Sequence, residues 1–163
     1  GHAGEAYRRQ GVGYYTMPAP QMGFHEQVWQ HEMAADPKGD VSVMLVNDAL
    51  EIAFEVVNRK DQFPCNYQWQ NFHAGQYALG MEPSTNHVQG RSFAKERDEL
   101  IWLEHGDARR YDVTFRVLTG EGEIARAESR IRAVASPPEE EYPEVSGKHV
   151  PLRRATEGHD QGN

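Results

Sequence analysis

The stretch that decides the fold class is Val-Ser-Val-Met-Leu-Val-Asn-Asp-Ala-Leu-Glu-Ile-Ala-Phe-Glu-Val-Val, residues 41–57. Residues 41–47 are rich in β-branched side chains and partly alternate in polarity, and residues 50–57 alternate almost cleanly. Both patterns are typical of strands whose successive side chains point to opposite faces of a sheet. Because polar Asn47 and Asp48 separate the two segments, the sequence predicts an antiparallel pair joined there.

Further strands are predicted on both sides of this pair, and a mainly β fold follows from them. They are bounded by loops rich in Gly, Pro and polar residues, and they cover residues 24–31, 66–70, 76–82, 101–103 and 111–118. Pro83 is expected to end the strand before it, because proline cannot donate to a ladder. A turn is predicted at residues 36–40, helical turns at 92–100, and an amphipathic helix at 122–135.

Length and charge narrow the function classes. The chain has 163 residues and 38% hydrophobic content, which suits one domain. A formal net charge of -8 argues against nucleic acid as a partner. Neither a membrane-spanning apolar run nor a signal-peptide pattern occurs, so a cytoplasmic protein is expected. We expect residues 1–136 to form the β domain and residues 137–163 to be a disordered tail.

Glu82 is the most informative candidate for chemistry. It follows an apolar strand and precedes Pro83, so its carboxylate is expected at a sheet rim, where burial raises a carboxyl pKa and makes a general base. The commoner alternative is an ordinary strand-end glutamate exposed to water. Nearby, the Gln68-Trp69-Gln70 triplet offers an aromatic face and amides, as sugars require, although a half-buried strand with Trp69 in the core would look the same.

Metal and phosphate chemistry have no recognisable motif. The eight histidines show neither His-x-His nor His-Glu-x-x-His spacing, and Cys65 is the single cysteine. Most of the histidines are therefore expected at the surface or in hydrogen bonds, and neither a metal nor an organic cofactor is predicted. No glycine-rich phosphate loop or nucleophile elbow occurs.

Five short motifs occur in a particular order, and together they resemble the aldose 1-epimerase (galactose mutarotase) superfamily. They are Gly23–Val28, Tyr67–Gln70, Tyr77–Pro83, Gly90-Arg91 and Leu103–Asp107. Within that superfamily they are most similar to the bacterial aldose-epimerase-like branch catalogued as a domain of unknown function. The resemblance covers about residues 14–132.

The resemblance implies a galactose-mutarotase-like antiparallel β-supersandwich that binds a monosaccharide in an open cleft. In that family a Glu removes the proton of the anomeric hydroxyl while a His protonates the ring oxygen, and no cofactor is needed. Glu82 matches the Glu and is the expected catalytic residue. The candidate sugar contacts are Gln68, Trp69, Asn86, Arg91, His25 and Glu26.

One departure from the family pattern leaves three functions open. The family's His lies in an upstream His-x-Asn segment that this chain lacks, and the family fold usually needs a longer chain. We therefore expect a C-terminal portion whose missing half is an upstream segment or a second copy in a homo-oligomer. The alternatives are an aldose 1-epimerase, a non-catalytic monosaccharide-binding module of the same fold, and an oligomeric β scaffold without a small ligand.

Overall fold

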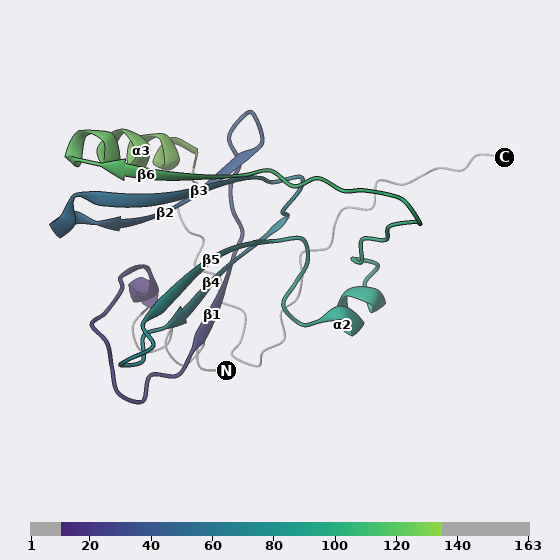
Figure 1. Cartoon of the computed structure of the whole chain (residues 1–163), viewed down its shortest axis with the longest axis horizontal. Helices are drawn as coiled ribbons and strands as arrows, with labels where there is room; N and C mark the ends of the chain where they lie inside the picture. The colour runs from purple at the N-terminus through teal and green to yellow at the C-terminus, as the bar shows by residue number, and fades with distance from the viewer. Residues whose placement is uncertain (1–10, 135–163) are drawn as a thin grey trace.

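Six strands form two three-stranded antiparallel sheets in the computed structural model, which describes residues 11–134 (Figure 1). The first sheet has the order β1-β4-β5, and its strands are β1 (Gln27–His31), β4 (Cys65–Asn71) and β5 (Ala78–Ser84). The second has the order β2-β3-β6, with β2 (Asp40–Asn47), β3 (Ile52–Arg59) and β6 (Val113–Thr119). The expectation of a mainly antiparallel β fold with short helices is confirmed.

The predicted pair at residues 41–57 is the hairpin β2–β3, and local side chains fix both of its ends. A single turn of 3-10 helix, η2 (Asp48–Leu50), joins the strands, and the Asn47 side chain accepts a hydrogen bond from the Leu50 backbone N–H. Before β2, Asp36 Oδ1 accepts hydrogen bonds from two backbone N–H groups of the predicted turn at residues 36–40. These bonds satisfy turn amides that no ladder reaches.

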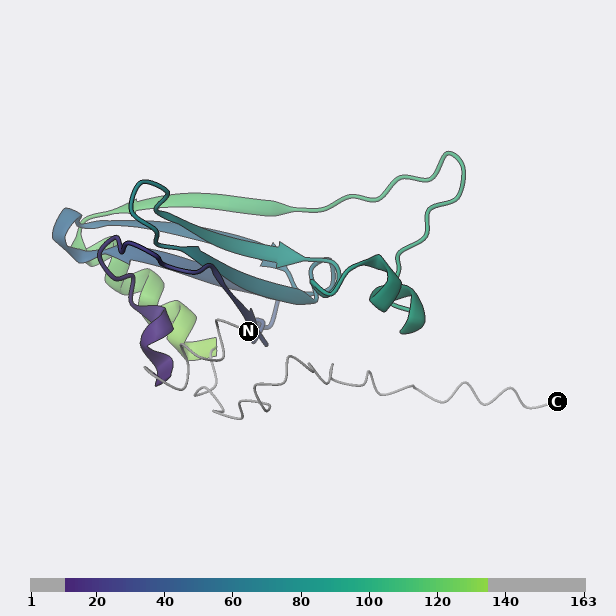
Figure 2. The same cartoon turned by 90° about the horizontal axis from the view of Figure 1, so that it is seen from below.

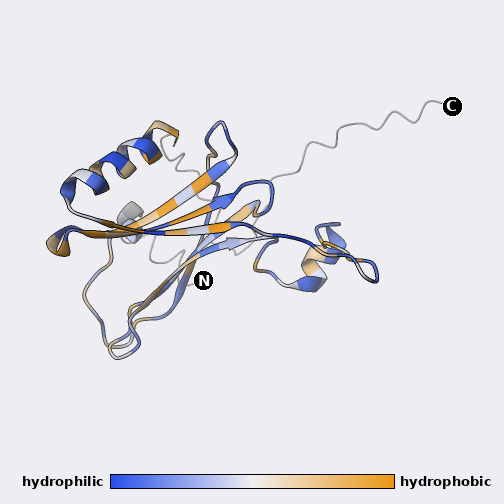
Figure 3. Cartoon of the chain, turned by 45° about the horizontal axis from the view of Figure 1, so that its top comes forward, coloured by the Kyte–Doolittle hydropathy of each residue, from blue (hydrophilic) through white to orange (hydrophobic). Residues whose placement is uncertain are grey.

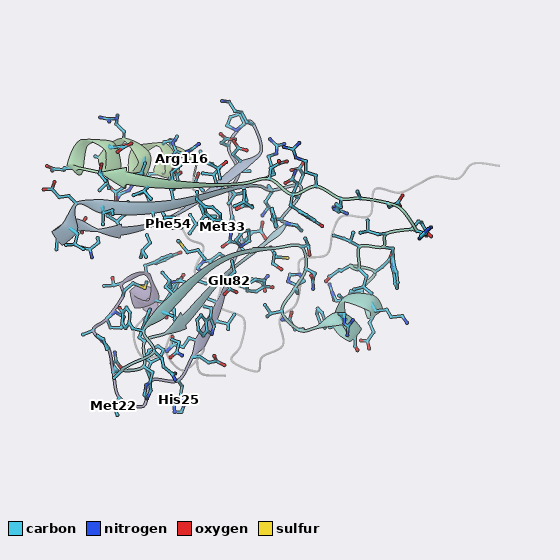
Figure 4. All side chains as sticks on the ribbon, in the orientation of Figure 1. Met22, His25, Met33, Phe54, Glu82 and Arg116 are labelled. Atoms are coloured by element: carbon cyan, nitrogen blue, oxygen red, sulfur yellow. The ribbon has the colours of Figure 1, made fainter. Side chains whose placement is uncertain are left out.

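Helix α3 (Glu121–Val134) covers one face of the sheet β2-β3-β6, as the apolar pattern at residues 122–135 predicts. Ala53 and Leu118 of the sheet pack against Ile124 and Ala127 of the helix to form a buried cluster. The opposite face of the sheet is turned toward β1-β4-β5 (Figures 1 and 2) and carries Phe54, Phe115 and Val117, which are 38%, 66% and 62% exposed. Phe54 lies in the space between the sheets (Figure 4). Figure 3 shows the same division, with a hydrophilic outer surface on α3 and apolar bands on the strands.

One face of the sheet β1-β4-β5 is covered by the segment that contains η1 (Gly11–Tyr15). The Tyr14 ring stacks on Trp29 at a centroid distance of 4.3 Å, and Trp29 is only 3% exposed. The Tyr14 carbonyl oxygen accepts hydrogen bonds from the side chains of Gln68 and Gln70, at 3.2 and 2.7 Å. This N-terminal segment therefore holds the Gln68 and Gln70 side chains of β4.

Two sequence predictions about strands are wrong. Pro83 does not end β5, which continues to Ser84 with Pro83 paired to Asn66. Proline is tolerated there because β5 lies at the edge of its sheet among the described residues, where one side of the strand needs no donor. Residues 101–103 form no strand, and their apolar side chains are exposed, Trp102 at 73%.

The remaining expectations concern a short helix, a membrane span and the C-terminal tail. The predicted helical turns at residues 92–100 are α2 (Arg91–Glu96), which lies apart from both sheets (Figure 1). No helix among residues 11–134 is long and apolar enough to cross a membrane. The predicted tail at residues 137–163 lies outside the described residues, and the proposed domain boundary at 136 stays a prediction.

Candidate functional site

Glu82 lies on β5 with its carboxylate exposed and close to the strand backbone (Figure 4). A Cβ atom added at Gly80 would lie 2.3 Å from Glu82 Oε1, so the carboxylate occupies the space that a side chain at position 80 would fill. Within the described part of the chain, no hydrogen bond or ion pair engages this carboxylate. It is therefore available to a ligand on this face of the sheet.

Trp69 lies on the same face and provides a flat apolar surface beside that carboxylate. In the register of the sheet, Trp69 pairs with Gly80 on one side and with Val28 on the other. Its indole Nε1 donates a hydrogen bond to Glu26 Oε2 at 3.1 Å, and Val28 is 42% exposed. An aromatic surface with carboxylates at its edges matches what a pyranose offers, which is a C–H face surrounded by hydroxyl donors.

A buried tyrosine on the same face holds a histidine. Tyr67 pairs with Glu82 in the register, is 1% exposed, and has its hydroxyl 3.0 Å from His87 Nδ1. The same hydroxyl accepts a hydrogen bond from the Val88 backbone N–H at 3.3 Å, so the loop after β5 folds back over Tyr67. Burial raises the pKa of Tyr67 to about 12, which keeps the hydroxyl neutral as it orients the His87 ring.

The structure brings together three of the predicted site residues. Glu82, Trp69 and Glu26 share one face of β1-β4-β5, with Trp69 hydrogen-bonded to Glu26. Gln68 lies on the opposite face, where its side chain contacts His31 Nε2 at 3.2 Å and the Tyr14 carbonyl. Strand alternation imposes this separation, because adjacent residues of a strand point to opposite faces.

The other three predicted contacts lie outside this group. Asn86 is in the loop after β5, and its side-chain amide donates to the His87 carbonyl at 3.1 Å. Arg91 is exposed at the start of α2, away from the sheets. His25 is exposed before β1, near the end of the sheet far from Glu82 (Figure 4). The structure does not bring these side chains to Glu82, and their role in sugar binding stays a prediction.

Two further residues of this face are not among the predicted sugar contacts. Tyr67 and His87 belong to the polar and aromatic residues around Glu82 whose types bind sugars, but the sequence does not show that they contact each other. Their connection depends on the register that pairs Tyr67 with Glu82 and on the loop that returns His87 over the strand. In residues 11–134, no three His, Cys, Asp or Glu side chains gather as a metal ion would require.

Comparison with solved structures finds a protein with a similar architecture. A solved structure from Klebsiella pneumoniae subsp. pneumoniae, described as a "putative aldose 1-epimerase", matches with a TM-score of 0.72 at 20% sequence identity. The match covers 83% of this chain and 35% of that chain, so this chain spans about a third of the relative's length. It shows that the two share a fold, as the resemblance implied.

Comparison with curated proteins finds no match. The family model described as "Domain of unknown function (DUF4432)" matches residues 2–117, which is more than half of the 163 residues. The chain therefore belongs to the DUF4432 family.

Proposed function

We propose that this chain binds a monosaccharide against Trp69 and interconverts its anomers by acid–base ring opening, as an aldose 1-epimerase does. The observation that carries the proposal is the position of the Glu82 carboxylate, which lies over Gly80, beside the Trp69 ring and on the same face as the Tyr67–His87 pair. A base and a histidine on one face, with a flat apolar surface for the sugar ring, are the groups that this reaction needs.

The proposed reaction moves two protons and no other atoms between sugar and protein. Glu82 takes the proton of the anomeric hydroxyl while protonated His87 gives a proton to the ring oxygen, and the bond between C1 and the ring oxygen breaks. The open-chain aldehyde rotates and closes on its other face, as Glu82 returns its proton to the carbonyl oxygen and His87 recovers the proton of the attacking hydroxyl. Histidine suits this role because it exchanges protons near neutral pH.

Polarimetry tests the proposal. We expect the chain to accelerate the change in optical rotation of freshly dissolved α-D-glucose or α-D-galactose, and Glu82→Gln to remove most of the acceleration. His87→Gln is expected to lower the rate by about 10²- to 10⁴-fold, the usual contribution of one proton-transfer group. The matched control is Glu96→Gln, an exposed glutamate of α2, which keeps the full rate. Equal rates with all three variants would refute the proposal.

A second function is a sugar-binding module without catalysis. Glu82 is exposed to water, whereas a carboxylate that acts as a general base is commonly buried. The hydrogen-bonded side chains of Trp69 and Glu26, together with the exposed Val28, would bind a sugar equally well without proton transfer. Calorimetry that detects binding of these aldoses, with optical rotation changing at the uncatalysed rate, selects this function over the first.

A further inference from the structure

A pocket of about 230 Å³ lies between α3, the sheet β2-β3-β6 and the turn before β2. Three basic side chains line it, namely Lys38 of the turn, Arg116 of β6 and Arg130 of α3. Its apolar wall includes Met33, Val57 and Ile131. The volume is below the roughly 300–1,000 Å³ of sites for drug-sized ligands, so it suits a small molecule.

A buried carboxylate fixes the two arginines at this pocket. Glu55 has a side chain with 0% exposure, and its oxygens accept hydrogen bonds from Arg130 Nη2 at 2.7 Å and Arg116 Nη1 at 3.1 Å. Burial by itself raises the pKa of Glu55, but the hydrogen bonds from Arg130, Arg116 and Ser42 outweigh it and hold the pKa below its ordinary value. Two guanidinium groups therefore share one negative charge, and each is about half exposed, at 46% and 48%.

The basic groups at the pocket differ in the contacts that they make within the described residues. Arg130 Nη1 donates to the Ser42 hydroxyl at 3.3 Å. By contrast, Arg116 Nη2 has no hydrogen-bond or ion-pair partner in the part of the chain that the structure describes. The Lys38 ammonium interacts electrostatically with the Asp36 carboxylate but makes no hydrogen bond to it. A planar guanidinium with a free edge binds carboxylate and phosphate oxygens in pairs, which makes Arg116 a suitable anion ligand.

The two acidic residues at the pocket rim contact the turn and Arg59. Asp36 Oδ1 accepts two backbone hydrogen bonds of the turn, and Asp40 Oδ1 lies 3.6 Å from Arg59 Nη1. Asp61 also lies 3.3 Å from Arg59 Nε, so the four negative charges of Asp36, Asp40, Glu55 and Asp61 balance the four positive charges of Arg59, Lys38, Arg116 and Arg130. The surroundings of the pocket are therefore neutral, in a chain whose formal net charge is -8.

We propose that this pocket binds a small organic anion. The carboxylate or phosphate group of the ligand is held by Arg116, Arg130 and Lys38, and its apolar part packs on the apolar wall. The pocket lies on the α3 face of the sheet β2-β3-β6, whereas Glu82 and Trp69 belong to the other sheet. The proposal is therefore independent of sugar binding and can fail or succeed without it.

The test is an NMR titration of the full chain with inorganic phosphate and, separately, with butyrate, each at constant ionic strength set with chloride. We expect at least one of the two to give saturable shifts of the Arg116 and Arg130 Nε–H signals. Lys38→Glu is expected to weaken that binding at least tenfold, because it replaces a ligand by a repelling charge without touching the Glu55 pairs. Lys95→Glu, on exposed α2, makes the same charge change away from the pocket and keeps the affinity within twofold.

The outcomes separate the head groups and the alternatives. Saturation by phosphate alone, or by butyrate alone, supports the proposal and identifies the group that the arginines bind. No saturable shift with either probe overturns it. Equal weakening by Lys38→Glu and Lys95→Glu overturns it as well, because general attraction by the whole chain would then explain the binding. Far-ultraviolet circular dichroism confirms that each variant keeps its β structure.

Discussion

Gly80→Ala tests whether the observed position of Glu82 is the functional one. A Cβ atom at position 80 would lie 2.3 Å from Glu82 Oε1, 3.0 Å from Cδ and 3.1 Å from Cγ. Ordinary contact begins at about 3.4 Å, so the carboxylate oxygen must move by about 1 Å. A displacement of this size costs as much as about 100-fold in rate when it moves a catalytic group. We therefore expect Gly80→Ala to lower the proposed mutarotation rate by a factor approaching about 100.

Stability is expected to move in the opposite direction. Alanine loses less backbone entropy than glycine in a strand, so the free energy of unfolding should be unchanged or higher by about 0.5–1 kcal/mol. The control is Gly122→Ala in α3, whose added Cβ meets only Arg126 Nη1 at 3.6 Å and should leave the rate unchanged. Polarimetry and urea unfolding measure the two effects. If Gly80→Ala keeps both the rate and the sugar affinity within twofold, the placement of Glu82 over Gly80 has no functional meaning.

Three further predictions concern the buried polar groups. Arg130→Met leaves Glu55 with one guanidinium, and we expect it to lower the free energy of unfolding in urea by about 3 kcal/mol, near the lower end for a broken buried pair. The control Arg132→Met removes an exposed pair with Glu128 and should lower it by less than about 1 kcal/mol. Because the pKa of Glu55 is lowered in the folded state, the ionised Glu55 stabilises the fold above the ordinary glutamate pKa, and this stability is lost as the pH falls through the folded pKa. Acid unfolding of Glu55→Gln should lack this loss of stability. Because the pKa of Tyr67 is raised to about 12, stability should fall between about pH 10 and 12, a loss that Tyr67→Phe does not show.

The fold was predictable where polarity alternates and local turns set the register. Residues 41–57 carry both signals, and the hairpin β2–β3 formed as expected. The amphipathic pattern before Val134 likewise predicted α3. Residues 101–103 misled because three consecutive apolar side chains fit a short strand, yet in the structure they find neither a strand partner nor a core. Local composition does not reveal whether a neighbouring strand is available.

The candidate site was predictable only in part, because its geometry depends on pairings between distant segments. Glu82 and Trp69 were singled out by residue type and by the strand-Glu-Pro motif. Tyr67 and His87 required the pairing of β4 with β5 and the return of the following loop. The pocket beside Glu55 shows the same limit, since Arg116 and Arg130 lie 61 and 75 residues beyond that carboxylate in the sequence.

The Tyr67–Gln70 motif shows how one strand serves two purposes. Its period of two sends Gln68 and Gln70 to the face where Tyr14 and Trp29 pack, and it sends Tyr67 and Trp69 to the face of Glu82. The amides therefore hold the N-terminal segment against the sheet. On the other face, Trp69 lies beside Glu82 where we propose that a sugar binds, and the buried Tyr67 holds His87. A one-residue shift of register would exchange these roles, so the hydrogen bonds that Gln68 and Gln70 make to Tyr14 also stabilise the orientation of Trp69.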